Sequence, residues 1–207
     1  LSSDENEFYR RLDRLMDISA RSLSVKRSII TKLLDEGLYP YTKKYLGTFN
    51  NHFSTIGLVG MNEAGLNAKW LQADMTHEKT QEFSKQVLNH MRERLSDYQE
   101  MYGDLYNLEA TPAESTTYRL AKHDKEEFPH IVTAGEDGDV PYYTNSSHLP
   151  VDYTADIFDA KKRFVNDCSK KMILAPKTMM IQSLKSISLM LAKQIVFCFL
   201  PMERQCL

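Results

Sequence analysis

The stretch LYNLEATPAESTTYRLAK, residues 105–122, carries the clearest structural pattern in this chain. Residues 105–110 predict a short buried strand, residues 111–114 predict a turn, and residues 115–122 predict a short helix. A strand that passes through a tight turn into a helix is a building unit of α/β proteins. This stretch therefore predicts an α/β fold.

The same alternation extends toward both ends of the stretch. Residues 4–36 and 76–102 have apolar side chains near helical spacing, and residues 53–60 (FSTIGLVG) predict a second buried strand. Each long helix has candidate residues to cap its start and to end it: Asp4 and Gly37 for the first, and Thr76 and Gly103 for the second. Residues 142–144 predict a third, short strand. Such alternation favours parallel pairing, with binding sites at the carboxyl ends of the strands.

The turn that follows residue 110 is dense in hydroxyl groups where a helix begins. Backbone N–H groups and the helix dipole both favour an anion at such a position. The side chains of the turn add neutral donors, from Thr111, Ser115, Thr116 and Thr117. These groups could hold a phosphate without a lysine. The same residues also fit an ordinary helix cap, with Thr111 as the cap and Glu114 three residues later, and both interpretations remain open.

Two other polar segments follow predicted strands. Gly57 and Gly60 permit close approach of the backbone, but no lysine follows them, so this segment is not a P-loop. Asn145, Ser146 and Ser147 offer amide and hydroxyl groups that suit sugar hydroxyls, or that form an Asx or Ser turn.

The composition excludes several classes of protein. The net charge of −2 gives no general attraction to nucleic acid or to membranes. No uncharged apolar run approaches the roughly 18 residues of a membrane-spanning helix, and no signal peptide is visible. Three cysteines in 207 residues do not make a disulfide framework, and no HxxxH or HExxH motif suggests a metal site. We expect a cytoplasmic protein without nucleic-acid, membrane or metal partners.

The character of the chain changes near residue 160. Residues 161–207 contain none of the eight glycines and eleven tyrosines, but they contain all three cysteines and have an excess of Lys and Arg over acidic residues. Residues 179–199 could form an amphipathic or buried helix. We therefore divide the chain into residues 1–160 and a basic tail, residues 161–207. A genuine helical extension, a frameshift and a truncation would each produce this change.

Three long segments together resemble the anaerobic (class III) ribonucleoside-triphosphate reductase family. They are GLYPYTKKYLGTFNNHFSTIGLVGMNEA (37–64), LYNLEATPAESTTYRLAKHDKEEFPHI (105–131) and PYYTNSSHLPVDYT (141–154). The resemblance spans about residues 4–160. After Ala160 the family pattern of a Gln-rich helix and a Tyr-Thr-Gly-Gly-Thr strand does not follow, which favours frameshift or truncation as the origin of the tail.

The resemblance implies that the chain is an internal fragment, a partial segment of the ten-stranded α/β barrel of glycyl radical enzymes. Such reductases convert ribonucleoside triphosphates to deoxyribonucleoside triphosphates. A glycyl radical, installed by an S-adenosylmethionine iron–sulfur activating enzyme, generates a thiyl radical on a finger-loop cysteine. Neither residue falls within the resembling part, so we expect no catalytic residue here and no activity of the fragment alone. ATP or dATP effectors and a homodimer are implied for the full enzyme, and no cofactor is expected on the fragment.

The resemblance also implies that residues 111–117 form the turn that binds the substrate phosphates. The expected substrate-binding residues are Asn107, Glu109, Thr111, Ala113, Glu114, Ser115, Thr116, Thr117, Asn145, Ser146 and Ser147. Two alternatives remain. One is a standalone nucleotide-phosphate-binding module without catalysis. The other is a relative of formate lyases, which the phosphate turn disfavours because their substrates carry no triphosphate.

Overall fold

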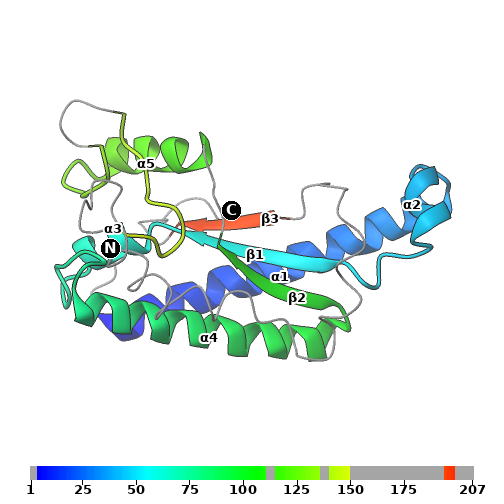
Figure 1. Cartoon of the computed structure of the whole chain (residues 1–207), viewed down its shortest axis with the longest axis horizontal. Helices are drawn as coiled ribbons and strands as arrows, with labels where there is room; N and C mark the ends of the chain where they lie inside the picture. The colour runs from blue at the N-terminus through cyan, green and yellow to red at the C-terminus, as the bar shows by residue number, and fades with distance from the viewer. Residues whose placement is uncertain (1–3, 111–114, 136–139, 150–193, 199–207) are drawn as a thin grey trace, which may run out of the picture.

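A computed structural model describes residues 4–110, 115–135, 140–149 and 194–198 of the chain (Figure 1). Helices and strands alternate along the described residues, as the sequence predicted. In chain order they are α1 (Glu5–Asp35), α2 (Pro40–Tyr45), β1 (Phe53–Val59), α3 (Met61–Asn67), α4 (Glu78–Tyr102), β2 (Leu105–Ala110), α5 (Ser115–Glu127) and β3 (Gln194–Cys198).

The strands form one parallel sheet in the order β2–β1–β3. In the register of β1 with β2, Phe53 lies opposite Leu105 and Leu58 lies opposite Ala110. Parallel neighbours cannot be joined by a tight hairpin, and here α3 and α4 form the crossover from β1 to β2. The predicted α/β class with parallel pairing is confirmed for the described part of the chain.

The two faces of the sheet are covered by different helices. Helices α1 and α4 run side by side along one face, and α5 lies on the opposite side, near the carboxyl end of β1 (Figure 1). Alternating side chains of each strand explain this arrangement. Ile56 and Leu58 of β1 pack with Leu108 of β2 in the large core beneath α1 and α4. Val59 points to the opposite face, into a smaller cluster with Ala121 of α5.

Local sequence signals set the ends of both long helices. The Asp4 side chain accepts a 2.9 Å hydrogen bond from the N–H of Glu7, and Gly103 ends α4 with φ +70°. The predicted Thr76 cap is wrong, because the residue before α4 is His77 and the Thr76 hydroxyl donates to Asp74 at 2.5 Å. None of the helices in the described ranges has the length and apolar character needed to cross a bilayer.

The structure corrects three further expectations. Residues 142–144 form no strand, because Tyr142 makes only an isolated antiparallel bridge with Ala134. Helix α5 extends to Glu127, beyond residue 122, because the buried stripe Thr117, Ala121 and Asp124 keeps helical spacing. The helix expected over residues 179–199 is wrong at Gln194–Cys198, which pair with β1 as strand β3. A short apolar run can be buried in either form, so its periodicity did not discriminate.

Candidate functional site

A loop of residues 142–148, called the polar loop below, is fastened to the carboxyl end of β1. The N–H of Gly60 donates to the carbonyl of Thr144 at 2.8 Å, and the N–H of Met61 donates to the carbonyl of Ser146 at 3.2 Å. Gly60 has φ +80°, a left-handed conformation that favours glycine, and it is the N-cap residue of α3. The structure therefore brings together two of the segments that the sequence indicated, the one with Gly57 and Gly60 and the one with Asn145, Ser146 and Ser147.

A buried carboxylate, that of Glu63, binds the polar loop through hydrogen bonds. Glu63 is fully buried, and its two oxygens accept from the Thr144 N–H at 3.0 Å and the Thr144 hydroxyl at 2.6 Å. Asn62 donates a third hydrogen bond to Glu63 at 3.0 Å. Glu63 was not among the residues predicted from the sequence. The available signal was a carboxylate three residues after the glycine that ends a buried strand.

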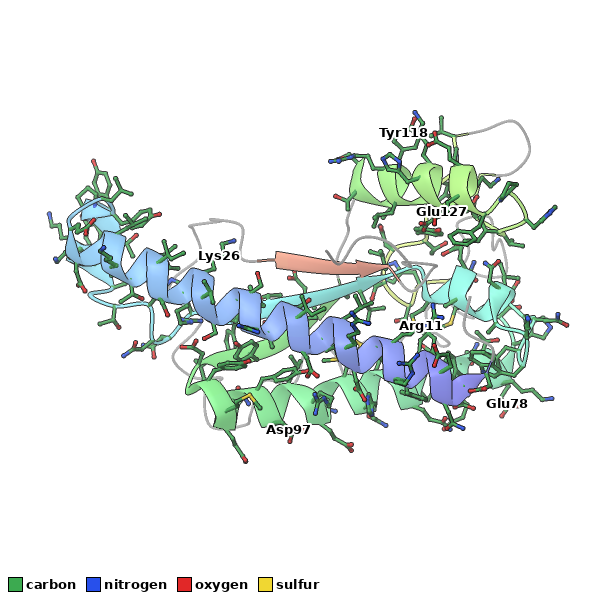
Figure 2. The ribbon with its side chains drawn as sticks, turned by 180° about the vertical axis from the view of Figure 1, so that it is seen from behind. Arg11, Lys26, Glu78, Asp97, Tyr118 and Glu127 are labelled. Atoms are coloured by element: carbon green, nitrogen blue, oxygen red, sulfur yellow. The ribbon has the colours of Figure 1, made fainter. Side chains whose placement is uncertain are left out.

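Helix α5 carries the described part of the predicted phosphate turn. Ser115 and Thr116 are exposed at its first two positions, whereas Thr117 is buried against the rest of the molecule. Seen from behind in Figure 2, α5 lies across the strands from α1 and α4, with Tyr118 pointing away from the sheet. Three of the predicted site residues, Thr111, Ala113 and Glu114, lie outside the described residues.

A buried hydrogen bond joins α5 to the polar loop. The hydroxyl of Tyr143 donates to Oδ2 of Asp124 at 2.6 Å. Burial raises the pKa of the Asp124 carboxyl, and the hydrogen bond from Tyr143 opposes that shift. The polar loop therefore packs against α5, the helix whose first residues belong to the predicted phosphate turn.

Asn107 and Glu109 lie on the face of β2 that is turned away from α1 and α4. Their neighbours Tyr106 and Leu108 are in the large core, and strand side chains alternate between faces. The side-chain oxygen of Asn107 accepts a 2.8 Å hydrogen bond from the hydroxyl of Thr55 on β1. The same face thus carries both predicted β2 residues and α5.

The remaining predicted residues form a turn within the polar loop. The N–H of His148 donates to the carbonyl of Asn145 at 3.0 Å, and Ser146 has φ +47° between them. Ser146 and Ser147 are buried, and Asn145 is half-buried. The backbone therefore forms a hydrogen-bonded turn from Asn145 to His148. Within the described ranges, no group of three or more His, Cys, Asp and Glu side chains is arranged to hold a metal ion.

Comparison with known proteins identifies the family. The model of the family "Anaerobic ribonucleoside-triphosphate reductase" matches residues 1–170, which reaches past residue 160. The anaerobic ribonucleoside-triphosphate reductase of Haemophilus influenzae is 27% identical to the chain, over 76% of the chain and 24% of that protein.

Solved structures of the anaerobic ribonucleotide reductase from Thermotoga maritima have the same fold. The one with glycerol in the active site has a TM-score of 0.68 and 22% identity, covering 83% of this chain and 28% of that chain. The one in complex with dATP and CTP has a TM-score of 0.66 and 23% identity, covering 81% and 27%. The chain spans about a quarter of the length of these relatives. Because the family model covers most of its residues, the chain belongs to the anaerobic ribonucleoside-triphosphate reductase family.

Proposed function

We propose that the chain supplies part of the barrel wall and the substrate-phosphate turn of an enzyme that reduces ribonucleoside triphosphates to deoxyribonucleoside triphosphates. The observation that carries this proposal is the hydrogen bond from Tyr143 of the polar loop to Asp124 of α5, which packs the loop against the helix that begins at Ser115, at the carboxyl end of a parallel sheet. Ligands of α/β proteins bind at the carboxyl ends of such strands. The three described strands would belong to a ten-stranded barrel of the glycyl radical type.

The start of α5 is suited to phosphate. The first turn of a helix presents backbone N–H groups without intrahelical partners, at the positive end of the helix dipole. Ser115 and Thr116 are exposed there and add two hydroxyl donors. Hydrogen bonds to a charged group contribute roughly 1.5–3 kcal/mol each, so a few of them suffice to hold a triphosphate. We assign Thr111, Ala113 and Glu114, which precede Ser115 in the sequence, to the same phosphate-binding turn.

The sugar would be bound by the polar loop and by β2. The side chains of Asn145 and Ser147 form no hydrogen bond with another residue in the part of the chain that the structure describes. Their amide and hydroxyl groups can therefore bond to ribose hydroxyls. Asn107 and Glu109 share the face of the sheet on which α5 lies, and we assign them to the same substrate.

The radical chemistry would be carried by other parts of the reductase. We propose a glycyl radical and a thiyl cysteine outside the residues that resemble the family here, an S-adenosylmethionine iron–sulfur activating enzyme, a homodimer, and ATP or dATP as effectors, in the cytoplasm. The T. maritima complex with dATP and CTP supports nucleotide substrates and effectors. The isolated chain should accordingly form no dCTP from CTP under anaerobic conditions with the activating enzyme.

Binding of CTP to the 207-residue chain tests the phosphate turn. Calorimetry should detect CTP but not cytidine, because the phosphates provide most of the affinity. In Ser115→Asp, a carboxylate at the start of α5 interacts favourably with the helix dipole by about 0.3–1 kcal/mol but repels phosphate. This variant should keep or raise the melting temperature and lose CTP binding.

A matched control distinguishes the effect of a negative charge at the start of α5 from the effect of a lower net charge of the whole chain. Ser22→Asp adds the same charge at an exposed position of α1, across the sheet from α5, and should bind CTP as the unchanged chain does. If Ser115→Asp also binds CTP normally, or if the unchanged chain binds none, the turn is only a helix cap and the proposal fails.

A further inference from the structure

The hydrogen bond between Tyr143 and Asp124 connects two parts of the proposed site without being exposed to a ligand. Tyr143 is 0% exposed and Asp124 is 9% exposed, and the two oxygens are 2.6 Å apart. Neither residue is among those expected to touch substrate. Their effect on a substrate must therefore be exerted through the elements to which they belong.

Tyr143 is held firmly relative to the sheet. On one side of it, Tyr142 exchanges two backbone hydrogen bonds with Ala134, at 3.0 and 3.1 Å. On the other side, Thr144 is bonded to Glu63 and to Gly60. The Tyr143 ring belongs to the buried cluster at the end of β1, with Val59, Ala121 and Ile131. Its hydroxyl therefore has a fixed position relative to the sheet, and the hydrogen bond from this hydroxyl to Asp124 can position α5.

Asp124 lies on the buried face of α5, toward the end of the helix. Thr117, Ala121 and Asp124 are the buried residues of this helix, and their spacing puts them on one face. An α-helix rises about 1.5 Å per residue, so the Asp124 tie acts roughly 13 Å from Ser115 along the axis. A helix tied at one side chain and packed at Thr117 cannot rotate or slide freely. The Tyr143–Asp124 hydrogen bond and the packing at Thr117 together therefore limit where the first-turn N–H groups and hydroxyls can point.

We propose that Tyr143 and Asp124 are positioning residues that hold the phosphate-binding start of α5 in register with the polar loop. One ribonucleoside triphosphate would then contact both, with its phosphates at α5 and its ribose at Asn145 and Ser147. This inference rests on the proposed function, because it concerns the geometry of the same site. A misplacement of about 1 Å in such a site can lower binding or catalysis strongly.

Substitutions at these two positions separate the effect of the Tyr143–Asp124 hydrogen bond on CTP binding from the effect of the Asp124 charge. Tyr143→Phe removes only the donor hydroxyl, and Asp124→Leu removes the acceptor. Both should raise the dissociation constant for CTP by roughly 10-fold, which corresponds to about 1.4 kcal/mol. Asp124→Asn keeps a neutral oxygen that accepts the same hydrogen bond, and it should bind CTP as the unchanged chain does. The double variant Tyr143→Phe/Asp124→Leu should be no worse than either single one, because both remove one interaction.

Tyr106→Phe is the matched control for a loss of stability without a role in binding. Tyr106 is also a buried tyrosine, 4% exposed, and its hydroxyl donates to the carbonyl of Ala20 at 2.9 Å, joining β2 to α1. Tyr106→Phe should lower the melting temperature as Tyr143→Phe does but leave CTP affinity unchanged. Calorimetric titrations would be made well below all melting temperatures.

The outcomes distinguish this inference from the proposed function. If the unchanged chain binds no CTP, the phosphate turn itself is wrong and the positioning role falls with it. If the unchanged chain binds CTP and Tyr143→Phe and Asp124→Leu bind it equally well, only the positioning role is overturned. Equal weakening by Tyr106→Phe would also overturn it, because the effect would then reflect general destabilisation.

Discussion

Thr144 donates both its backbone N–H and its hydroxyl to the buried carboxylate of Glu63, at 3.0 and 2.6 Å. This pair joins the polar loop to the first turn of α3, across 81 positions of the sequence. A buried carboxylate is stable only when hydrogen-bond donors replace the water it has lost. Glu63 has three such donors, because Asn62 also bonds to it. The polar loop therefore depends on Glu63 for its position.

Glu63→Gln should destabilise the fold although the two side chains have almost the same shape. A glutamine has one acceptor oxygen, and its NH2 group would face a donor of Thr144. A buried donor left without an acceptor costs about 1–3 kcal/mol, which is the expected loss in unfolding free energy. Urea denaturation measures it, with Glu93→Gln on the exposed face of α4 as the control. A loss no greater than that of the control would show that Glu63 does not hold the loop.

Arg27→Met should destabilise the fold more than Glu63→Gln or Gly65→Ala. Arg27 is 8% exposed, donates to the carbonyls of Phe49 and His52 at 2.6 Å each, and forms a 3.1 Å ion pair with Asp104. It thereby joins α1 to the segment that enters β1 and to the start of β2. Its removal takes these hydrogen bonds and the ion pair away from a largely buried site, at a cost of about 3–5 kcal/mol in unfolding free energy.

The control for Arg27 is Arg21→Met, which removes the same charge from an exposed position of α1. Exposed charges contribute little, so this variant should stay within about 0.5 kcal/mol of the unchanged chain. Equal effects of the two substitutions, measured by urea denaturation, would contradict the role assigned to Arg27.

Gly65→Ala should destabilise a helix in which alanine would normally be favoured. In an open helix this change contributes about 1 kcal/mol of stability. Here a Cβ at Gly65 would overlap Cγ2 of Thr80 and lie 2.5 Å from the carbonyl oxygen of Ala73. Overpacking of this kind costs about 1–3 kcal/mol. Thr80→Ser in the same chain removes the methyl group and should recover part of the loss, because the Ala73 carbonyl remains. A Gly65→Ala variant with a raised melting temperature would refute the close packing.

Asp74 should make the fold sensitive to acid. Burial raises the pKa of its carboxyl, but hydrogen bonds from the Thr76 hydroxyl, the Thr76 N–H and His77 outweigh burial and lower the pKa below its ordinary value. A carboxyl with a lowered pKa in the folded state contributes stability above its unfolded pKa, and that contribution is lost as the pH falls through the folded value.

The comparison of Asp74→Asn with the unchanged chain measures this contribution. The difference in unfolding free energy should be largest near pH 6 and should shrink below about pH 4. Thr76→Val removes one of the donors and should make the pH dependence shallower. A difference that stays constant from pH 6 to pH 3 would contradict the assignment.

The site was only partly predictable from the sequence. The sequence indicated the features that depend on neighbours within a few positions. These are the strand before residue 111, the hydroxyls of Ser115 and Thr116, and the turn at Asn145. Glu63 and Asp124 were missed because their partners are 81 and 19 residues away. Pairs of that kind form only when two elements pack together. Whether the indicated residues bind a nucleotide stays a prediction until CTP binding is measured.

The sequence by itself determined the long helices, the two strands β1 and β2 and their parallel pairing, because apolar spacing and capping residues such as Asp4 and Gly103 act locally. The family also followed from the sequence, because three long segments resemble the family and occur in the family's order. Only the tertiary structure decided that Gln194–Cys198 form a strand beside β1, since a short apolar run is buried equally well as helix or strand until a neighbouring edge is available. It also decided that Glu63 holds the polar loop and that Tyr143 of this loop bonds to Asp124 of α5, because a buried donor or acceptor takes whichever partner the packing of the sheet brings within reach.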